Sequence, residues 1–437
     1  MSIRKATMRG IAVAAAGSLA LTACGSGDDG GSGNGGGDVT LNFTWWGSDE
    51  RAERYDAAVK LFQEKHPGIR VQTSFNNFED YWNLRNTDAT SGGLPDVLQM
   101  DLSYLWDFAG NGLLADLGDH TEDRIDLSGL DEELVSSGEV DGGLFAIPTG
   151  TNTLALLYNP GLLEDLGVDL PDWDYTWEDY RSFLAEVSEA GADRSPAVHG
   201  GDDYTTVWWL FMQGLVQEGI EPFGEDGEMN FSEDDMRDWL ASAEDIREPV
   251  NLTFPITRAE QLDPLSGFTA GEAAVEFHWD NFLAGYTNEL GVDDLGLMPV
   301  PGGADGQKNM FFKPTMQLAM GANSDHPEEA ALLIDFLIND PEAGAIFGTD
   351  MGVPSSQSQR DSLDLEEGSV DARVIAYEEA VSEAGYMTAV VPRPVPGFGS
   401  VENEYSNNLG DEFSHGQIDV DSFVDRWFSE APYHLEQ

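Results

Sequence analysis

The sequence predicts an α/β protein with two domains. Three observations predict this: strand-like and helical segments alternate, most of the 437 residues follow a short leader, and 10% of all residues are aromatic. Alternation of this kind is typical of a mostly parallel sheet flanked by helices. A chain of this length exceeds what one hydrophobic core usually serves, so we expect two cores.

The first elements follow one another at short intervals. Val39–Trp46 alternates apolar and polar side chains and predicts a strand. The next segment carries apolar residues at helical spacing until His66-Pro67-Gly68, which predicts a helix and its end. The same reasoning predicts a strand at 69–75, a helix at 80–91 and a strand at 96–100.

The second half is predicted to be mainly helical. Two apolar strand-like runs meet around Pro148-Thr149-Gly150, and helices follow Pro160. Thr176 and Ser232 are expected to cap two of these helices, and residues 205–219 form an unusually apolar one. Later segments predict strands at 294–300 and 316–320, a helix at 327–338 and another from Pro341.

The leader has the layout of a secretory signal peptide, with three basic residues before an apolar run at 10–20. Residues 21–24, LTAC, resemble the bacterial lipobox, which implies removal of residues 1–23 and lipidation of Cys24. Residues 24–37 would then be the lipidated cysteine and a flexible Gly/Ser/Asp linker. The alternative is a low-complexity tail after an unrelated free cysteine.

Charge excludes some partners. The net charge is −60, from 81 acidic and 21 basic residues. The acids are scattered along the chain, which is typical of a solvated surface in high salt, where screening removes self-repulsion. Nucleic acid is excluded as a partner, because phosphate binding needs clustered bases.

Several motifs together resemble the maltose-type, carbohydrate-binding solute-binding proteins of bacterial ABC importers. They are Trp45-Trp46-Gly47, SGGLPDVLQMD (91–101), NGLLADL (111–117), GLFAIPTGTNTLALLYN (143–159), TWEDY (176–180), the helix beginning HPEEAALLIDFL, and MGVPSS (351–356).

The resemblance implies a two-lobed, periplasmic-binding-protein-like α/β fold with discontinuous lobes joined by crossover hinge strands. The N-terminal lobe would comprise 38–148 and 302–340, and the C-terminal lobe 149–301 and 341–437. A saccharide would bind in the cleft, favour lobe closure and be delivered to an ABC permease in the membrane. The resemblance also implies a monomer, no cofactor and an anchor on the outer face of the cell membrane.

Ligand contacts are expected from side chains that cover sugar rings or read hydroxyl groups. In the first lobe the candidates are Trp45, Trp46, Asp101, Ser103, Tyr104 and Asn152. Of the tryptophan pair we favour Trp46, because neighbours in a strand point to opposite faces. Helix capping is the competing explanation for Asp101 and Ser103.

In the second lobe the candidates are Tyr204, Trp208, Trp279, Asp280, Asn281, Arg393 and Phe398, with Trp209 and Lys313 as weaker possibilities. Trp279 and Asp280 are favoured because they follow a strand of small and apolar residues, where the family presents a stacking ring. A core position is the competing explanation for the tryptophans that open the apolar helix.

Three other classes are weaker. A glycoside hydrolase would need two carboxylates, but 81 acids produce any spacing by chance, and the common hydrolase, zinc-protease and phosphate-loop motifs are absent from the sequence. The seven histidines are isolated, which disfavours a metal site. The remaining alternative keeps the fold and changes the cargo to a polyamine or another small cation. We therefore predict a non-catalytic saccharide receptor.

Overall fold

The computed structural model describes residues 39–130, 132–224, 227–247, 252–363, 365–388, 392 and 394–435. Asp38–Gln437 forms one compact unit. The expected signal peptide, Cys24, the linker and Arg393 lie outside the described residues.

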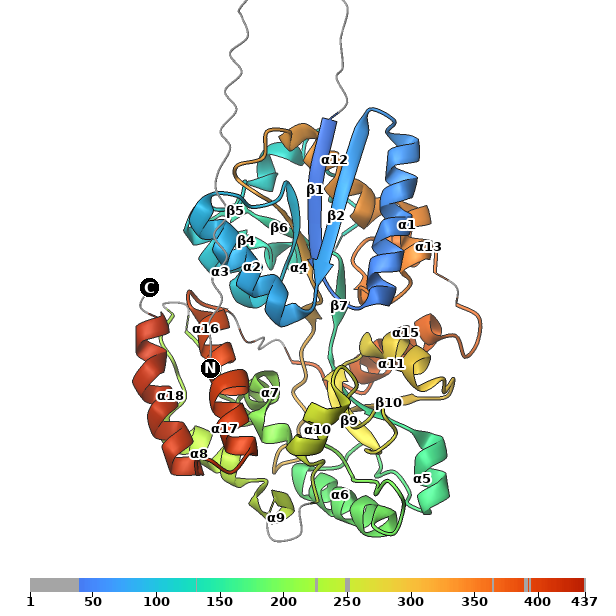
Figure 1. The fold of residues 1–437 in the computed structure, drawn as a ribbon, viewed down its shortest axis with the longest axis vertical. Coiled ribbons are helices and arrows are strands. Elements are labelled where there is room, and N and C mark those ends of the chain that lie inside the picture. Colours follow the sequence, from blue (N-terminus) through green and yellow to red (C-terminus); the bar gives the residue numbers. More distant parts are fainter. Residues whose placement is uncertain are drawn as a thin grey trace, which may run out of the picture. The chain divides into compact units, whose positions relative to one another are not determined.

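The first sheet has five strands in the order β2-β1-β3-β12-β6 (Figure 1). Both β2 and β3 pair with β1 in parallel, whereas β12 is antiparallel to β3 and β6. The strands are β1 (Val39–Trp46), β2 (Ile69–Asn76), β3 (Val97–Met100), β6 (Ala146–Pro148) and β12 (Gln317–Met320). Its mostly parallel start confirms the α/β prediction.

Helices pack with this first sheet, and four of them were predicted, namely those that begin at Asp49, Phe78, Pro327 and Pro341. They are α1 (Asp49–Lys65), α2 (Phe78–Ser91), α3 (Leu102–Gly110), α4 (Glu132–Ser136), α12 (Pro327–Asn339), α13 (Pro341–Phe347) and α14 (Gln357–Arg360). Helix α1 starts where the Ser48 hydroxyl accepts from the Arg51 amide, and it buries Tyr55, Val59 and Phe62. The helical spacing of these apolar residues is the pattern from which the helix was predicted. Two short strands, β4 (Glu139–Val140) and β5 (Gly143–Leu144), pair beside this core.

The second sheet is antiparallel throughout, unlike the expected mostly parallel arrangement. Its order is β10-β8-β9, formed by β8 (Leu154–Tyr158), β9 (Val275–Trp279) and β10 (Gly296–Pro299). Strand and helix patterns fix the type of each element, but not the direction in which a returning strand pairs.

Helices surround this second sheet. They are α5 (Pro160–Leu166), α6 (Trp177–Gly191), α7 (Trp208–Gln217), α8 (Glu233–Ala241), α9 (Glu244–Arg247), α10 (Ile256–Leu262), α11 (Phe282–Leu290), α15 (Val370–Glu383), α16 (Phe398–Asn403), α17 (Gly410–Ser414) and α18 (Val420–Leu435). A π-helical turn, Glu404–Leu409, joins α16 to α17. Thr176 and Ser232 form the expected caps, each completed by an aspartate at the third helical position.

Three short strands connect the two halves of the chain. They are β7 (Gly150–Asn152), β11 (Lys313–Pro314) and β13 (Val353–Pro354), in the order β11-β7-β13, and β7 is labelled between the two sheets in Figure 1. Gly150 is required there, because a Cβ atom would lie 2.7 Å from the carbonyl oxygens of both Met351 and Val353. A larger residue would push β13 away.

The two large hydrophobic clusters show which segment packs with which sheet. The first contains residues from Leu41 to Ile147 and from Met316 to Met351. The second contains residues from Leu154 to Phe311 and from Tyr377 to Ala431. The expected boundaries at 302 and 341 differ from this division. Pro301 only ends a strand and Pro341 only begins α13, whereas the chain passes between cores at β11 and β13.

Candidate ligand-binding site

Four rings form an aromatic cluster at the end of the first sheet, which we call the first ring cluster: Trp46, Phe78, Trp82 and Tyr104. Trp82 and Tyr104 stack with centroids 3.8 Å apart, and Trp46 lies 5.4 Å from Phe78 and 5.9 Å from Trp82. Phe78 is 45% exposed, and Tyr104 is partly exposed. Trp46 and Trp82 are buried, so only Phe78 and Tyr104 of this cluster offer ring surface to solvent.

The sequence missed two of these rings. Phe78 and Trp82 are both in α2 and are four residues apart, so they share one helical face. The predicted helix began at residue 80, which left Phe78 in a loop and hid this spacing. An earlier helix start at the Asn77 cap would have revealed the pair.

The second core contributes the second ring cluster: Trp209, Trp279 and Phe398. Trp209 lies 5.7 Å from Trp279 and 5.5 Å from Phe398, measured between ring centroids. Trp279 ends β9 and is partly exposed, whereas Phe398 is buried. Only Trp279 therefore offers an accessible ring, at the strand end where the sequence predicted one.

A lysine connects the two cores at this point. The Lys313 Nζ atom lies 3.3 Å from Asp101 Oδ2, and 5.2 and 5.1 Å from the ring centroids of Trp209 and Trp279. Asp101 ends β3 and also caps α3, because its Oδ1 accepts from the Ser103 amide at 2.8 Å. Asp101 thus caps α3 with its Oδ1 atom and pairs with Lys313 through its Oδ2 atom. Helix capping, the alternative that the sequence offered for Asp101, therefore holds for Oδ1.

Glu402 of α16 is a further acid beside this pair. Burial raises the pKa of its carboxyl to about 7, and the nearby Asp101 contributes to the rise. The charge of Lys313 opposes that rise. Glu402 was not predicted, because one glutamate among 81 acids carries no distinguishing signal.

Helices α3 and α16 join the two cores next to these groups. The Gly397 amide donates to Asp107 Oδ1 at 2.8 Å, and a Cβ atom at Gly399 would lie 2.8 Å from Tyr104 Cε1. Burial raises the pKa of Asp107, and the hydrogen bond from Gly397 opposes this. The close approach of α16 to Tyr104 depends on the missing side chain at Gly399.

Four predicted contacts are core residues instead. Trp45 is 1% exposed and packs against Phe43 and Tyr55 with centroids 4.9 and 4.6 Å away. Tyr204, Trp208 and Phe398 are also buried in the second hydrophobic cluster. Trp45 is buried because both faces of β1 are covered, and its neighbour Trp46 is 8% exposed for the same reason.

Trp208 and Trp209 are both buried, but their rings face different neighbours. Helix α7 is buried along nearly its whole length, so its sequence has no polar face to orient it. The Trp208 ring packs against Tyr405 and Trp427, and its neighbour Trp209 contacts Trp279. Only packing decides which of the two indoles reaches the site.

Asn152, Asp280 and Asn281 lie in a buried polar network at the crossing strands. Asn152 Nδ2 donates to Asn281 Oδ1 at 3.3 Å, and Asp280 Oδ2 accepts from the Thr153 amide at 3.1 Å. All three side chains are buried and bond within the protein, so their role as ligand contacts stays a prediction. Arg393 lies outside the described residues, so its predicted role stays a prediction.

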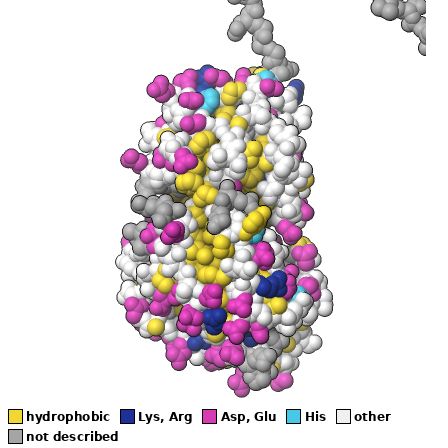
Figure 2. Space-filling view, turned by 90° about the vertical axis from the view of Figure 1, so that its left-hand side faces the viewer, with side chains coloured by type: hydrophobic (Ala, Val, Ile, Leu, Met, Phe, Trp, Pro, Cys, Tyr) yellow, Lys and Arg dark blue, Asp and Glu magenta, His cyan; other side chains and the backbone are white. Residues whose placement is uncertain are grey.

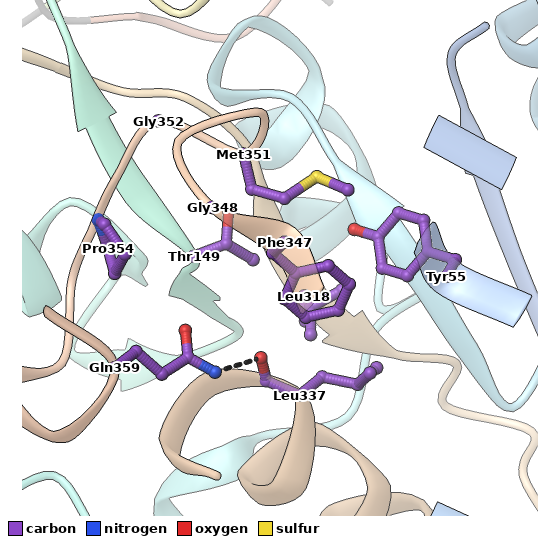
Figure 3. Close-up of a pocket in the computed structure, with 10 residues that line it drawn as sticks. All are labelled: Tyr55, Thr149, Leu318, Leu337, Phe347, Gly348, Met351, Gly352, Pro354 and Gln359. Carbon is purple, nitrogen blue, oxygen red and sulfur yellow. Dashed lines mark hydrogen bonds between the residues drawn. The ribbon is translucent and has the colours of Figure 1, made fainter. Parts of the chain in front are cut away.

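Two other spaces compete as ligand sites. The cavity in Figure 3 measures about 10 Å³ between Tyr55, Leu318 and Phe347, which is room for about one water molecule. An open groove of about 590 Å³ lies along α17 and the preceding π-helical turn, lined by Glu260, Glu404, Asn407, Asn408, Asp411, Glu412, His415, Gln417 and Arg426. The cavity is too small for a sugar, and the groove has no Trp, Tyr or Phe in its lining to cover a sugar ring.

The surface view agrees with an apolar site in an acidic protein. On the face shown in Figure 2, hydrophobic side chains gather through the middle, with Asp and Glu side chains around them. Among the described residues, we find no group of three or more His, Cys, Asp or Glu side chains arranged to hold a metal ion.

Comparison with solved structures supports the fold. A periplasmic solute-binding protein from Pectobacterium atrosepticum and an oligogalacturonide-binding protein from Yersinia enterocolitica each give a TM-score of 0.77 at 21% identity, covering 91% of this chain and 99% of that chain. An ABC substrate-binding protein from Listeria monocytogenes, in complex with cycloalternan, gives 0.75 at 20% identity, covering 89% and 97%. The two-lobed fold prediction is confirmed.

Sequence relatives and a family model agree with this fold. An erythritol/L-threitol-binding protein from Mycolicibacterium smegmatis is 25% identical over 369 residues, covering 75% of each chain. An arabinooligosaccharide-binding protein from Halalkalibacterium halodurans is 26% identical over 189 residues, covering 42% of this chain and 41% of the relative. None of the helices in the described part of the chain has the length and apolarity to cross a membrane. The model for bacterial extracellular solute-binding proteins matches residues 46–344, and the chain belongs to that family.

Proposed function

We propose that this protein captures a mono- or oligosaccharide, or a related polyol, between its two cores and delivers it to the permease of an ABC importer. The observation that carries the proposal is the partly exposed Trp279 ring, which lies beside the Lys313 and Asp101 pair. An indole face covers the C–H surface of a sugar, and charged groups bond its hydroxyls. The names of the two relatives support a hydroxylated ligand.

The proposed contacts come from both cores. Trp46, Phe78, Asp101, Ser103 and Tyr104 lie on or beside β1, α2, β3 and α3 of the first core, and Trp279 and Glu402 lie on β9 and α16 of the second. A ligand that bonds both sets favours the closed arrangement of two lobes by its differential affinity for it. We place the lobe boundaries at β7, β11 and β13, because the two hydrophobic clusters divide there.

Binding without catalysis is the proposed mode of action. The relatives and the family are binding proteins, and the charged groups of the site pair with one another instead of flanking an open reaction centre. Release of the bound sugar unchanged after denaturation of the complex would agree with this. Release of a shortened sugar would contradict it.

The carbohydrate assignment is tested by titration calorimetry and thermal shift with erythritol, L-threitol, arabinose and arabino-oligosaccharides at high salt. A ligand that binds only the native protein raises the melting temperature in proportion to its saturation. Stabilisation by at least one of these compounds is expected. If putrescine or spermidine stabilises the protein while every carbohydrate fails, the cargo is a cation.

Trp279→Ala is expected to weaken the binding of that carbohydrate about tenfold, since loss of a stacked aromatic contact costs about 0.5–1.5 kcal/mol beyond its buried area. Trp173→Ala is the matched control, because Trp173 is also partly exposed and packs near Tyr377 and Tyr386, away from Lys313. The control should bind as the wild type does. Equal affinity of the wild type, Trp279→Ala and Trp173→Ala for the carbohydrate would show that Trp279 does not contact it.

Membrane attachment through Cys24 is proposed from the lipobox-like segment. A lipoprotein cysteine that carries several acyl chains anchors a protein stably, whereas one chain does not. Cys24→Ala is expected to move the protein from the membrane fraction to the soluble extracytoplasmic fraction. Detergent phase partitioning measures this change. An unchanged membrane fraction in the variant would show that another segment holds the protein.

A further inference from the structure

Lys313 occupies an unusual position for a protein with so few basic residues. Lys313 lies in β11, between the two cores, and pairs there with Asn152 of β7. It is only 4% exposed. Its Nζ atom contacts one carboxylate and lies over two indole rings. Most of the ion pairs of this protein are more exposed than this one.

Indole faces next to carboxylates are the chemistry that binds organic cations. Trp209, Trp279, Asp101 and Glu402 supply two rings and two acids around one point. The protein also carries a net charge of −60, which concentrates cations near its surface. Without a basic side chain of its own, this arrangement would favour amines over sugars.

Lys313 fills that cation position from inside the protein. Its ammonium group neutralises Asp101 and lies over both indole rings at about the distance that an amine of a ligand would take. A second ammonium at the same place would meet like charge in a poorly hydrated environment, where such repulsion is costly. A neutral hydroxylated ligand meets no such repulsion.

We propose that Lys313 determines the specificity of this site, in that its ammonium excludes organic cations and so reserves the two ring clusters for neutral sugars and polyols. The inference rests on the proposed function and adds to it the class of ligand that is rejected.

Removal of the ammonium should therefore open the site to amines. In Lys313→Ala, Asp101 loses its partner, and a buried carboxylate without a partner is strongly unfavourable. Putrescine or n-butylammonium should occupy the vacated space, with affinity at least about tenfold above that of the wild type. Calorimetry and thermal shift, with sodium chloride added to constant ionic strength, measure this gain.

Two controls separate the specific effect from a change in total charge. Lys60→Ala removes an exposed lysine of α1, and Lys313→Arg keeps the cation in place. Neither should gain amine binding. Partial unfolding of Lys313→Ala would weaken ligand binding, so it cannot produce a gain in amine binding. If Lys313→Ala is too unstable to purify, Lys313→Gln, which keeps a hydrogen-bond donor for Asp101, undergoes the same titrations with the same expected result.

The outcomes divide cleanly. Amine binding gained by Lys313→Ala or Lys313→Gln, and by neither control, supports the inference. A folded variant that binds amines no better than the wild type overturns it, as does an equal gain in Lys60→Ala. Failure of the proposed function is read separately, from a wild-type protein that binds none of the carbohydrates.

Discussion

Gly399→Val is expected to weaken ligand binding about tenfold to a hundredfold, while the melting temperature of the ligand-free protein stays at the wild-type value. A Cβ atom at this position would lie 2.8 Å from Tyr104 Cε1 and 3.1 Å from the Ser103 carbonyl oxygen. Overpacking of this kind costs about 1–3 kcal/mol, and about 1.4 kcal/mol corresponds to a factor of ten in affinity.

The strain is expected to act on closure and not on folding, because the colliding groups belong to different cores. Tyr104 cannot move aside easily, since its ring is stacked on Trp82 at 3.8 Å. Helix α16 must then move away from α3, which breaks the hydrogen bond from Gly397 to Asp107. The binding-competent closed form becomes less populated, and the apparent dissociation constant rises by the same factor.

Gly285→Val provides the matched control. Gly285 also lies within a helix, α11, but a Cβ atom there would meet no atom within 4 Å. Calorimetry on both variants should show weaker binding only for Gly399→Val, and small-angle scattering with ligand should show a more open form. Wild-type affinity in Gly399→Val would mean that α3 and α16 do not meet in the bound state.

Glu378→Gln is expected to make the free energy of unfolding depend less on pH between about pH 4 and pH 8. Glu378 of α15 and Asp280, which directly follows β9, are two neighbouring buried carboxyl groups. Burial raises the pKa of Asp280 to about 7. Burial, and then the charge of Asp280, hold the pKa of Glu378 well above its ordinary range.

The sign follows from these raised values. Ordinary carboxyl pKa values lie near about 4 in an unfolded chain, so the folded protein retains protons that the unfolded chain has lost. The stabilisation is complete below about pH 4 and is lost as the pH rises through the folded values. Each retained proton costs about 1.4 kcal/mol of stability per pH unit in this window.

Several groups surround Glu378 and Asp280 and remain in place in Glu378→Gln. The Thr151 hydroxyl donates to Glu378 Oε2 at 3.3 Å, Asp280 accepts from the Thr153 amide, and Arg360 is the cation that opposes the rise at Glu378. Tyr377 is also buried beside Asp280, and this burial raises the pKa of its phenol. A glutamine at 378 does not titrate.

Denaturant unfolding at each pH and at constant high salt measures the effect. The wild type should lose about 1.4 kcal/mol more per pH unit than Glu378→Gln, so the variant should be the more stable protein at pH 8. Glu379→Gln is the control, because Glu379 is the exposed neighbour in α15. Equal pH slopes for the wild type and Glu378→Gln would show that Glu378 does not retain a proton in this pH window.

Much of the local structure could be predicted from residue patterns. The helix at Asp49–Lys65, the strand at Val39–Trp46 and the caps at Thr176 and Ser232 were predicted because each depends on residues within a few positions of one another. Partly exposed Trp279 at the end of β9 was also predicted, since the strand before it and the end of that strand are visible in the sequence.

The errors have one cause in common, which is dependence on distant segments. Trp45 and Trp46 differ by one position, but both are enclosed by helices that approach from elsewhere in the chain. Trp208 and Trp209 could not be distinguished because α7 is covered on every side. The burial of Asp280 likewise depends on β7 and α15, which come from distant parts of the chain.

The sequence by itself determined the type of many of the helices and strands, the acidic charge and the motifs that resemble carbohydrate-binding proteins, because these depend on local spacing and composition. Only the tertiary structure decided which indole reaches the site and that Lys313 joins Asp101 to Trp279. It also placed Glu402 beside α3. Those contacts join residues separated by many positions in the chain, and burial and pairing between such residues are fixed only when the two cores are assembled.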